Sequence, residues 1–489
     1  MSIAKRIALE QKNSHMNNIA EHKKRLYTSQ DEEWISKVAK EIKQSIYPPQ
    51  YHIYPKTGLM NDPNGLAYFN NEYHVFFQWY PFAPVHGLKN WGHTKSKDLK
   101  HWSDQEMALI PQQEFDKDGC YSGNALEHDG KLYLFYTGNY KTENGKKPKQ
   151  CLAIMNKNGH IEKWNRPIIE DEHELFSGEL RDPFVFEENG FYYMLLGGGK
   201  FHTSKGLGFG DEGILLLYKS SNLTDWEYQG LIDIPIDTGY MLECPSLVRI
   251  QDKDILFLSV MGAKVDDPTL NNCFLSMVAV GKLDIENMKF DVEQYNRADD
   301  GFDFYAPQTF YGKDNLPLMY AWVGCGEQVY PENEKWKHGL TYPQELSFTQ
   351  DKFKRFPMKE ILDIFPVRNK IKSKETNILD RSYRIHITNG FQFRIGEEHD
   401  YWEFSYHKET KIAKLSRKEL KKEIDIERGL YRETIIENLE EVDVFVDHSF
   451  IEIYLNKGEK VFTFVEFQAG YKNLYSQCDD LNGYLFLEK

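Results

Sequence analysis

The stretch "NDPNGLAYFNNEYHVFFQWY", residues 61–80, places the carboxylate of Asp62 in a turn-forming segment, just before two apolar runs separated by a short polar turn. Asn-Asp-Pro-Asn-Gly is full of turn formers, so a plain turn is the simplest interpretation of Asp62 by itself. The two runs that follow are rich in aromatic residues and predict the strands of a β-hairpin. The rest of the chain repeats this arrangement and changes the interpretation.

The same pattern recurs along the chain with a period near sixty residues. Steps of 60, 60, 61 and 60 residues lead from Asp62 to four further polar markers, each followed by a hairpin pattern: Ser122, Asp182, Glu243 and Asp303. Asn-Gly and Asp-Gly between strand-forming runs are strong hairpin signals. A second marker runs in phase, because the segments "SKDLKHW", "NGHIEKW" and "SSNLTDW" end 62 residues apart, at Trp102, Trp164 and Trp226.

Five repeats of a β unit predict an all-β fold with a five-bladed β-propeller over residues 49–360. Blades are arranged radially, so equivalent positions converge at one end of a central channel. We therefore expect all five markers, Asp303 included, to line one axial cavity.

The two flanks of the propeller have different patterns. Residues 1–48 are predicted to form a short N-terminal helical extension, in which Ser29 and Glu32 form a capping box and Trp34, Val38 and Ile42 share one helix face. Residues 368–489 alternate apolar and polar side chains and predict a C-terminal β-sandwich domain. The charged stretch "SRKELKKEIDIER", residues 416–428, is interpreted as a solvated loop or edge.

The composition narrows the function classes. Aromatic residues make up 14% of the 489 residues, which favours β structure and suits stacking against sugars. The formal net charge of −15 argues against nucleic acid or an anionic membrane as the main partner. The six cysteines are scattered without a C-x-x-C pair, so we expect free thiols and no metal site. No P-loop pattern is present, and no cofactor is predicted.

The location of the protein is predicted from its first residues and its hydropathy. The segment "MSIAKRIALEQKNSHMNN" has no apolar core of the kind that signal peptides carry, and no apolar run of about 18 residues occurs in the chain. We expect a cytoplasmic protein with no membrane partner that acts on a small-molecule sugar. The oligomeric state is left open.

Four of the five markers are carboxylic acids, and three of them, Asp62, Asp182 and Glu243, are suited to the chemistry that glycosidic bond hydrolysis needs. One carboxyl group must be ionised, to attack the anomeric carbon, and another must be protonated, to donate to the leaving oxygen. Neighbouring amides would keep Asp62 ionised, whereas Glu243 has few donors in its local sequence and would stay neutral. We assign Asp62 as nucleophile, Glu243 as general acid and base, and Asp182 as stabiliser of the cationic transition state. The alternatives are a structural Arg181–Asp182 pair and a strand-end carboxylate at Glu243.

A set of ordered motifs then resembles glycoside hydrolase family 32: "LMNDPNG", "FQWYPFAP", "WGHTKSKDLKHW", "YSGNA", "RDPFVF", "ECPSL" and "DFYAPQTF". The resemblance implies a five-bladed propeller, retention of configuration and the same three catalytic assignments. It also implies fructosyl-binding positions at Leu59, Met60, Asn61, Gln78, Tyr121, Ser122 and Arg181. Candidate pocket-wall aromatics are Trp79, Phe82 and Trp91, with ordinary blade core as the alternative. One departure is Gln344 in "LTYPQEL", where the family has arginine, so an ion pair there is in doubt.

The segment "PFAPVHGLKNWGH" is similar to that of family members that act on sucrose 6-phosphate. An acidic protein that binds a phosphate dianion needs a local positive patch. The candidates are His86 and Lys89 in this segment, followed by Lys200 and His202, with plain surface charge as the alternative. The resemblance therefore implies a retaining hydrolase of sucrose 6-phosphate, and of sucrose as well, that releases fructose. An enzyme specific for unphosphorylated sucrose or short fructans, a fructosyltransferase and a non-catalytic sugar-binding protein remain open as other functions.

Overall fold

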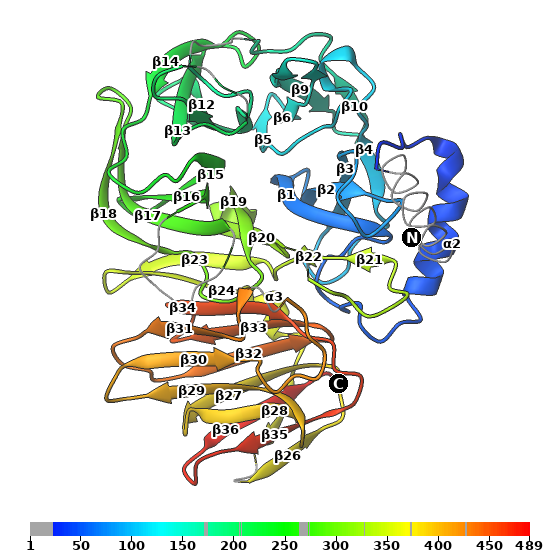
Figure 1. Cartoon of the computed structure of the whole chain (residues 1–489), viewed down its shortest axis with the longest axis vertical. Coiled ribbons are helices and arrows are strands. Elements are labelled where there is room, and N and C mark those ends of the chain that lie inside the picture. Colours follow the sequence, from blue (N-terminus) through cyan, green and yellow to red (C-terminus); the bar gives the residue numbers. More distant parts are fainter. Residues whose placement is uncertain are drawn as a thin grey trace, which may run out of the picture.

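The protein is described here by a computed structural model that covers residues 23–170, 175–204, 206, 208–263, 272, 274–326, 328–371, 374–425 and 428–489. Over these residues the chain is mostly β, which confirms the predicted all-β class (Figure 1). The helical elements are short: η1 (Ser29–Asp31), α2 (Glu32–Ile42), η2 (Glu114–Asp116), η3 (Lys313–Asn315) and α3 (Lys359–Leu362). Within the same ranges, every helix falls short of the length and apolar character that crossing a membrane requires.

Five sheets of four or five strands follow one another along the first part of the described chain. The first contains β21 (Trp336–Lys337), β1 (Gly58–Phe69), β2 (Glu72–Tyr80), β3 (Asn90–Ser96) and β4 (Glu106–Leu109). The second contains β10 (Ile161–Lys163), β9 (Lys149–Met155), β6 (Lys131–Gly138) and β5 (Ala125–His128). The third contains β11 (Arg181–Glu188), β12 (Phe191–Lys200), β13 (Glu212–Ser220) and β14 (Glu227–Leu231).

The last two sheets of this series have the same antiparallel order. The fourth contains β15 (Met241–Ile250), β16 (Lys253–Met261), β17 (Phe274–Asp284) and β18 (Lys289–Arg297). The fifth contains β19 (Tyr305–Tyr311), β20 (Pro317–Val323), β22 (Gly339–Leu340), β23 (Gln344–Thr349) and β24 (Lys352–Pro357). A separate two-stranded hairpin extends from the second sheet, formed by β7 (Lys141–Thr142) and β8 (Gly145–Lys146).

The first strands of the five sheets form a closed ring. β1 contacts β5, β5 contacts β11, β11 contacts β15, β15 contacts β19, and β19 contacts β1 again. The short strand β21, which follows the fifth sheet's second strand, pairs parallel with β1 and joins the end of the series to its beginning. Each predicted hairpin is confirmed as the first strand pair of a sheet.

The tryptophan that recurs with the second marker packs between neighbouring sheets. The ring of Trp102, next to the first sheet, lies 6.4 Å from that of Tyr320 in the fifth. The ring of Trp226, next to the third sheet, lies 6.1 Å from that of Phe135 in the second. A large ring at this position fills the space between two adjacent twisted sheets. The tryptophan therefore recurs with the same spacing as the sheets themselves.

The C-terminal part consists of two six-stranded antiparallel sheets at one end of the molecule (Figure 1). One contains β25 (Val367–Lys370), β36 (Asn482–Leu487), β27 (Ser382–Asn389), β32 (Val442–Asp447), β33 (Phe450–Leu455) and β34 (Lys460–Val465). The other contains β26 (Glu375–Ile378), β35 (Lys472–Ser476), β28 (Gln392–Glu397), β29 (Asp400–His407), β30 (Ile412–Ser416) and β31 (Tyr431–Ile435).

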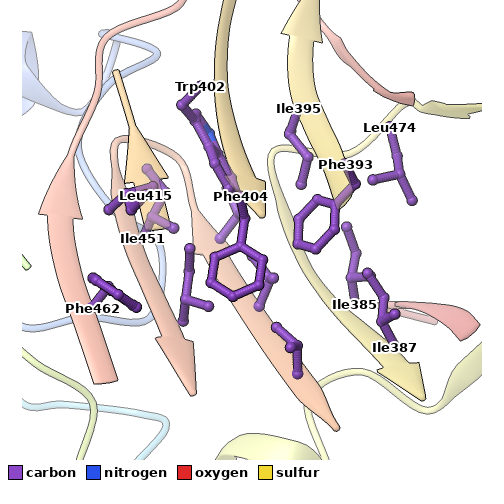
Figure 2. Close-up of a cluster of buried hydrophobic side chains, with 14 of the residues drawn as sticks. Ile385, Ile387, Phe393, Ile395, Trp402, Phe404, Leu415, Ile451, Phe462 and Leu474 are labelled. Carbon is purple, nitrogen blue, oxygen red and sulfur yellow. The ribbon is translucent and has the colours of Figure 1, made fainter. Parts of the chain in front are cut away.

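The core of the C-terminal part is formed by side chains from both sheets. Figure 2 shows Phe393 and Phe404 of one sheet near Ile385 and Phe462 of the other, and all four are fully buried. Each such side chain contributes about 1.5–3 kcal/mol through removal of apolar surface from water. The alternating pattern after residue 368 therefore encodes two inward faces.

Two details of the flanks differ from the sequence predictions. The capping box at the N-terminal helix is formed by Thr28 and Asp31 rather than by Ser29 and Glu32, because one 3-10 turn precedes α2. The buried helix face consists of Ile35, Val38 and Ile42, whereas Trp34 is 41% exposed and its ring packs 6.1 Å from Phe82.

The charged stretch at residues 416–428 is not wholly solvated, so that prediction is wrong in part. Arg417, Ile424 and Arg428 are buried. The backbone carbonyl of Ile424 accepts a hydrogen bond from Val329 N at 2.7 Å, which fixes the stretch against the loop after the fifth sheet's second strand. Alternation of charge alone did not reveal these contacts, because they involve residues about a hundred positions away.

The position of Gln344 resolves the doubt about an ion pair there. Its Oε1 accepts a hydrogen bond from Arg355 at 2.7 Å, and its Nε2 donates to the hydroxyl of Tyr454 at 2.8 Å. Arg355 lies on the adjacent strand β24 and pairs with the buried Asp299 at 2.5 Å. A buried arginine–aspartate pair is thus present at this junction, supplied by the neighbouring strand.

Candidate active site

The functional side chains lie at β-bulges, where the pairing between the first and second strands of a sheet shifts its register. In β1, β11, β15 and β19 the register against the second strand shifts by one residue, directly after Met60, Arg181, Glu243 and Tyr305. After the shift, Asp182, Cys244 and Ala306 adopt left-handed backbone conformations with φ of 66°, 46° and 50°. A bulge of this kind bends a strand and re-aims its side chains.

The positions of the bulges show that one of the five predicted markers, Asp303, was assigned to the wrong position. The equivalent positions Arg181, Glu243 and Tyr305 are 62 residues apart, so a step of sixty from Glu243 stops short at Asp303. Asp303 accepts hydrogen bonds from Gln328 and Arg428 at 2.7 Å each and from Val465 N at 2.9 Å. It therefore belongs to the junction with the C-terminal sheets, and the prediction that it joins the other markers is wrong.

Asp62 lies next to the second marker. Its Oδ2 accepts a hydrogen bond from Ser122 Oγ at 2.5 Å, and its Oδ1 accepts one from Asn61 Nδ2 at 3.2 Å. These donors favour the ionised form, as the sequence predicted. Burial has the larger effect, however, and raises the pKa of Asp62 above its usual range, with the charge of Glu243 acting in the same direction.

Asp182 lies on the other side of the Cys244 side chain. Its Oδ2 accepts a hydrogen bond from Cys244 N at 2.9 Å, and the thiol of Cys244 lies 3.4 Å from that oxygen and 3.6 Å from Asp62 Oδ2. Burial raises the pKa of Asp182 to about 7, which the positive charge of Arg181 opposes and the two other carboxylates reinforce. The structure thus brings the two predicted aspartates together around one thiol.

Glu243 has more hydrogen-bond donors than its local sequence suggested. Arg181 donates to its Oε1 from Nε at 3.0 Å and from NH2 at 2.8 Å, and the Tyr305 hydroxyl donates to its Oε2 at 2.6 Å. The prediction of a donor-poor setting is wrong, because both donors come from other strands. Arg181 therefore pairs with Glu243. Within the described residues, no hydrogen bond joins the side chains of Arg181 and Asp182, so the alternative of a pair between them is not supported.

Three residues of the site were missed in the sequence analysis. Cys244 and Tyr305 occupy the bulges of β15 and β19, and Glu179 contacts the far side of the Arg181 guanidinium. The first two could have been found by aligning the prolines Pro183, Pro245 and Pro307, which are 62 residues apart. No sequence signal marks Glu179 as a partner of Arg181 beyond its position two residues earlier.

The predicted fructosyl-binding residues fall into two groups. Asn61, Ser122 and Arg181 contact the carboxylates directly. Of the others, Leu59, Met60 and Gln78 are buried and Tyr121 is half-buried.

Two of the three candidate wall aromatics are core residues and do not line a pocket. Trp79 and Trp91 have no exposed surface, and their indole N–H groups donate to the carbonyls of Thr57 at 2.7 Å and Tyr121 at 2.9 Å. Both rings therefore belong to the core, which was the alternative interpretation. Phe82 is partly buried and stacks under the Arg25 guanidinium, 4.0 Å from it.

The predicted phosphate-binding pair lies close to the carboxylates. Lys89 Nζ donates to Asn61 Oδ1 at 2.6 Å and to His86 Nδ1 at 2.9 Å. The Lys89 ammonium holds the pKa of the His86 imidazole well below its usual range, and burial lowers the pKa of Lys89 to about 8. By contrast, Lys200 and His202 both contact Glu212, at 3.1 and 3.2 Å, and this carboxylate offsets the charge of Lys200.

The arrangement is suited to acid–base and covalent chemistry on a sugar. Three carboxyl groups share one cluster, one of them between an arginine and a tyrosine, and the charges of neighbouring carboxylates help to raise the pKa of both Asp62 and Asp182. Such a set can hold one proton on one carboxyl group while another stays ionised.

Residues 52–357 match the model of the glycosyl hydrolases family 32 N-terminal domain. The sucrose-6-phosphate hydrolase of Bacillus subtilis is 35% identical over 439 residues, covering 84% of this chain and 87% of the relative, and that of Staphylococcus xylosus is 31% identical over 462 residues, covering 89% and 90%. The solved structure of sucrose-6-phosphate hydrolase from Lactobacillus gasseri superposes with a TM-score of 0.88 at 29% identity, covering 96% of this chain and 98% of that one. A β-fructofuranosidase of Bombyx mori superposes with a TM-score of 0.81 at 26% identity, covering 94% and 97%. The chain belongs to glycosyl hydrolase family 32.

Proposed function

We propose that this chain is a retaining β-fructofuranosidase that hydrolyses sucrose 6-phosphate to glucose 6-phosphate and fructose. The observation that carries the proposal is the cluster of Asp62, Asp182 and Glu243, brought together from three strands that are far apart in sequence. The names of the relatives in Bacillus, Staphylococcus and Lactobacillus support the phosphorylated substrate.

The reaction proceeds in two displacements. In the first, the Asp62 carboxylate attacks the anomeric carbon of the fructosyl unit, and the bond to the leaving oxygen breaks as Glu243 gives that oxygen its proton. In the second, Glu243 takes a proton from water, whose oxygen attacks the same carbon and releases Asp62. Asp182 stabilises the positive charge that develops on the sugar ring.

The same proposal extends to the architecture and the location. The five sheets are the blades of a five-bladed propeller at residues 49–360, because their first strands form a closed ring. The two six-stranded sheets are the β-sandwich domain at residues 368–489. The helical extension is residues 1–48, of which 1–22 lie outside the described residues. We expect the enzyme to act in the cytoplasm on this small-molecule sugar.

Lys89 and His86 are proposed to read the phosphate. An ammonium has three N–H donors, and Lys89 uses two of them on Asn61 and His86, which leaves one for an oxygen of the substrate. His86 is exposed, and its ring packs edge-on 5.9 Å from Trp322. A charge-assisted hydrogen bond to phosphate contributes about 1.5–3 kcal/mol, which is roughly ten- to a hundred-fold in affinity.

Lys89→Ala is expected to lower kcat/KM for sucrose 6-phosphate about ten- to a hundred-fold more than for sucrose, since only the former carries the dianion. The measurement is the ratio of the two kcat/KM values for the wild type and the variant, at low and high salt. Lys200→Ala is the control, because Glu212 already offsets that lysine, and the ratio should not change. An equal loss on both sugars would mean that Lys89 positions Asn61 and reads no phosphate.

The proposed function is tested by turnover of sucrose 6-phosphate, sucrose and a short fructan, with product analysis at high sugar concentration. The expected order places sucrose 6-phosphate first, with free fructose as the product. A preference for fructan would replace the substrate proposed here, and oligosaccharide products would indicate fructosyl transfer. Binding without turnover would leave a sugar-binding protein.

A further inference from the structure

A chain of alternating charges runs from the surface to Glu243. Lys146 Nζ lies 2.8 Å from Glu179 Oε1 and donates a hydrogen bond to its Oε2 at 2.9 Å. Oε2 also accepts a hydrogen bond from Arg181 NH1, and Arg181 donates from Nε and NH2 to Glu243. The side chains of Glu179 and Arg181 are only 8% and 11% exposed, and that of Lys146 is 30% exposed. The chain thus has one end in solvent and the other among the reacting groups.

Arg181 creates a problem for a proton donor. A guanidinium that donates two hydrogen bonds to one carboxylate oxygen favours the ionised carboxylate, yet a general acid must carry a proton when substrate binds. The third guanidinium nitrogen of Arg181, NH1, pairs with the buried carboxylate of Glu179. That charge offsets part of the positive field of Arg181 at Glu243.

We propose that Glu179 and Lys146 are positioning residues that set the pH range over which Glu243 can donate its proton, by dividing the charge of Arg181 between two carboxylates. The inference rests on the proposed role of Glu243 and deepens it. Glu179 contributes the negative charge, and Lys146 moderates it from the solvent side. Neither residue needs to touch the substrate.

The other groups that face Glu243 cannot share the positive charge of Arg181 with it. Tyr305 donates to Glu243 from β19, and Asp62, Asp182 and the Cys244 thiol interact with it electrostatically from β1, β11 and its own strand. None of these four carries a positive charge or contacts Arg181 on the side of NH1. Glu179 is therefore the carboxylate placed to compete with Glu243 for the guanidinium.

The hairpin β7–β8 explains how Lys146 reaches Glu179. Lys146 ends β8, and a Cβ atom added at Gly178, next to Glu179, would lie 2.3 Å from the carbonyl oxygen of Lys146. The backbones of the two segments thus pass in direct contact, which only a glycine permits here. Lys141 pairs with Lys146 across the same hairpin and is exposed, so it provides a matched control.

The test compares pH profiles of kcat/KM, whose alkaline limb reports the free enzyme's essential acid. Glu179→Gln should move the alkaline limb about 1 pH unit lower, because Arg181 then acts on Glu243 alone. Lys146→Met should move it in the opposite direction, by about 0.3–0.5 pH unit, because Glu179 is no longer offset from the solvent side. Lys141→Met should leave the limb in place.

A purely structural role would change kcat or stability in both variants without moving the limb in opposite directions. Shifts in the same direction, or no shift in either variant, would overturn the proposal. If Glu179→Gln does not fold, the comparison of Lys146→Met with Lys141→Met decides alone. Overlapping profiles for these two variants would then count against the proposal.

A second measurement separates this proposal from the role of Glu243 itself. With a fructoside whose leaving group needs no proton, Glu243→Gln should recover part of the activity that it loses on sucrose 6-phosphate. If Glu243→Gln loses the same activity on both substrates, the acid is another residue and the proposed role of Glu243 fails. If the recovery is seen but Glu179→Gln and Lys146→Met do not shift the alkaline limb on sucrose 6-phosphate, only the charge-division proposal fails.

Discussion

Asp62→Asn is expected to lower kcat on sucrose 6-phosphate by about 10⁴-fold or more, because an amide cannot form the covalent bond to the fructosyl carbon. The substitution keeps the size of the side chain and an oxygen that can accept the hydrogen bond from Ser122 Oγ. Folding should therefore be retained, with a melting temperature close to that of the wild type. The measurement is the steady-state rate at saturating substrate, together with thermal unfolding of the same preparation.

The matched control for this variant is Asp129→Asn. Asp129 lies in the hairpin turn of the second sheet with φ of 49°, a conformation that asparagine tolerates well. Its activity should stay within about two-fold of the wild type, since exposed substitutions away from the site have small effects. Substantial residual turnover by Asp62→Asn on pure enzyme would remove Asp62 from the role of nucleophile.

Glu243→Gln completes the argument about the cluster. It should be almost inactive on the natural sugar, whose leaving oxygen needs a proton, and partly active on a fructoside with a stable leaving anion. Equal loss on both substrates would mean that Glu243 is not the acid.

The second large effect concerns stability and the residue His52. Its Nδ1 lies 2.7 Å from Asp447 and its Nε2 lies 2.9 Å from Glu452, and all three side chains are completely buried. The ring also stacks 3.7 Å from Tyr342. His52 precedes β1, whereas both carboxylates belong to the C-terminal sheets, so the triad joins the two parts of the chain.

His52→Leu is expected to destabilise the protein by about 3–5 kcal/mol, because it leaves two buried carboxylates without their shared cation. The measurement is the midpoint of guanidinium unfolding at pH 6.5, followed by more than one probe because the two parts of the chain can unfold in separate steps. His101→Leu is the control: it removes an exposed histidine that lies 2.7 Å from Asp98, and the midpoint should hardly change.

The same triad predicts a dependence of stability on pH. Burial alone would lower the pKa of His52, but the hydrogen bonds and charges of Asp447 and Glu452 outweigh it and raise the pKa to about 9. A histidine whose folded pKa lies above its unfolded value, about 6.5, stabilises the fold fully below the unfolded pKa, and this contribution is lost as pH rises through 9. The wild type should lose stability between these values, and the loss should be smaller in His52→Leu. Identical pH dependence in both proteins would contradict the assignment.

Much of the fold was predictable because local signals recur. The hairpins at Asn70–Asn71, Asp129–Gly130 and Asn189–Gly190 follow from residues that accept positive φ, and all three adopt it. The repeat was also visible in the tryptophans that recur every 62 residues. The space between neighbouring sheets is filled by a large ring at equivalent positions. The helix cap was misplaced by one residue since Thr28-Asp31 and Ser29-Glu32 fit the same pattern.

The pairings among charged groups were the least predictable part. The alternative of an Arg181–Asp182 pair rested only on their adjacency in sequence. A bulge turns Asp182 toward Cys244 and leaves Arg181 facing Glu243. Asp303 was expected in the cluster, but the slip of register moves Tyr305 to that level instead. A repeat length counted in the sequence does not show where a strand has a bulge. A bulge changes the direction of the side chains next to it, so the residues that meet in the site cannot be read from the repeat alone.

The sequence by itself determined the repeated hairpins, the two inward faces of the C-terminal sheets and the three carboxylic acids near the start of their strands, because spacing and residue type are local properties. Only the tertiary structure decided which charge faces which: Glu243 with Arg181 and Tyr305, Glu179 with Lys146, His52 with Asp447 and Glu452. The physical reason is that these pairs join residues between 33 and 400 positions apart. Their energies depend on burial and on distances of about 3 Å, which are set when the sheets pack and the strands bulge.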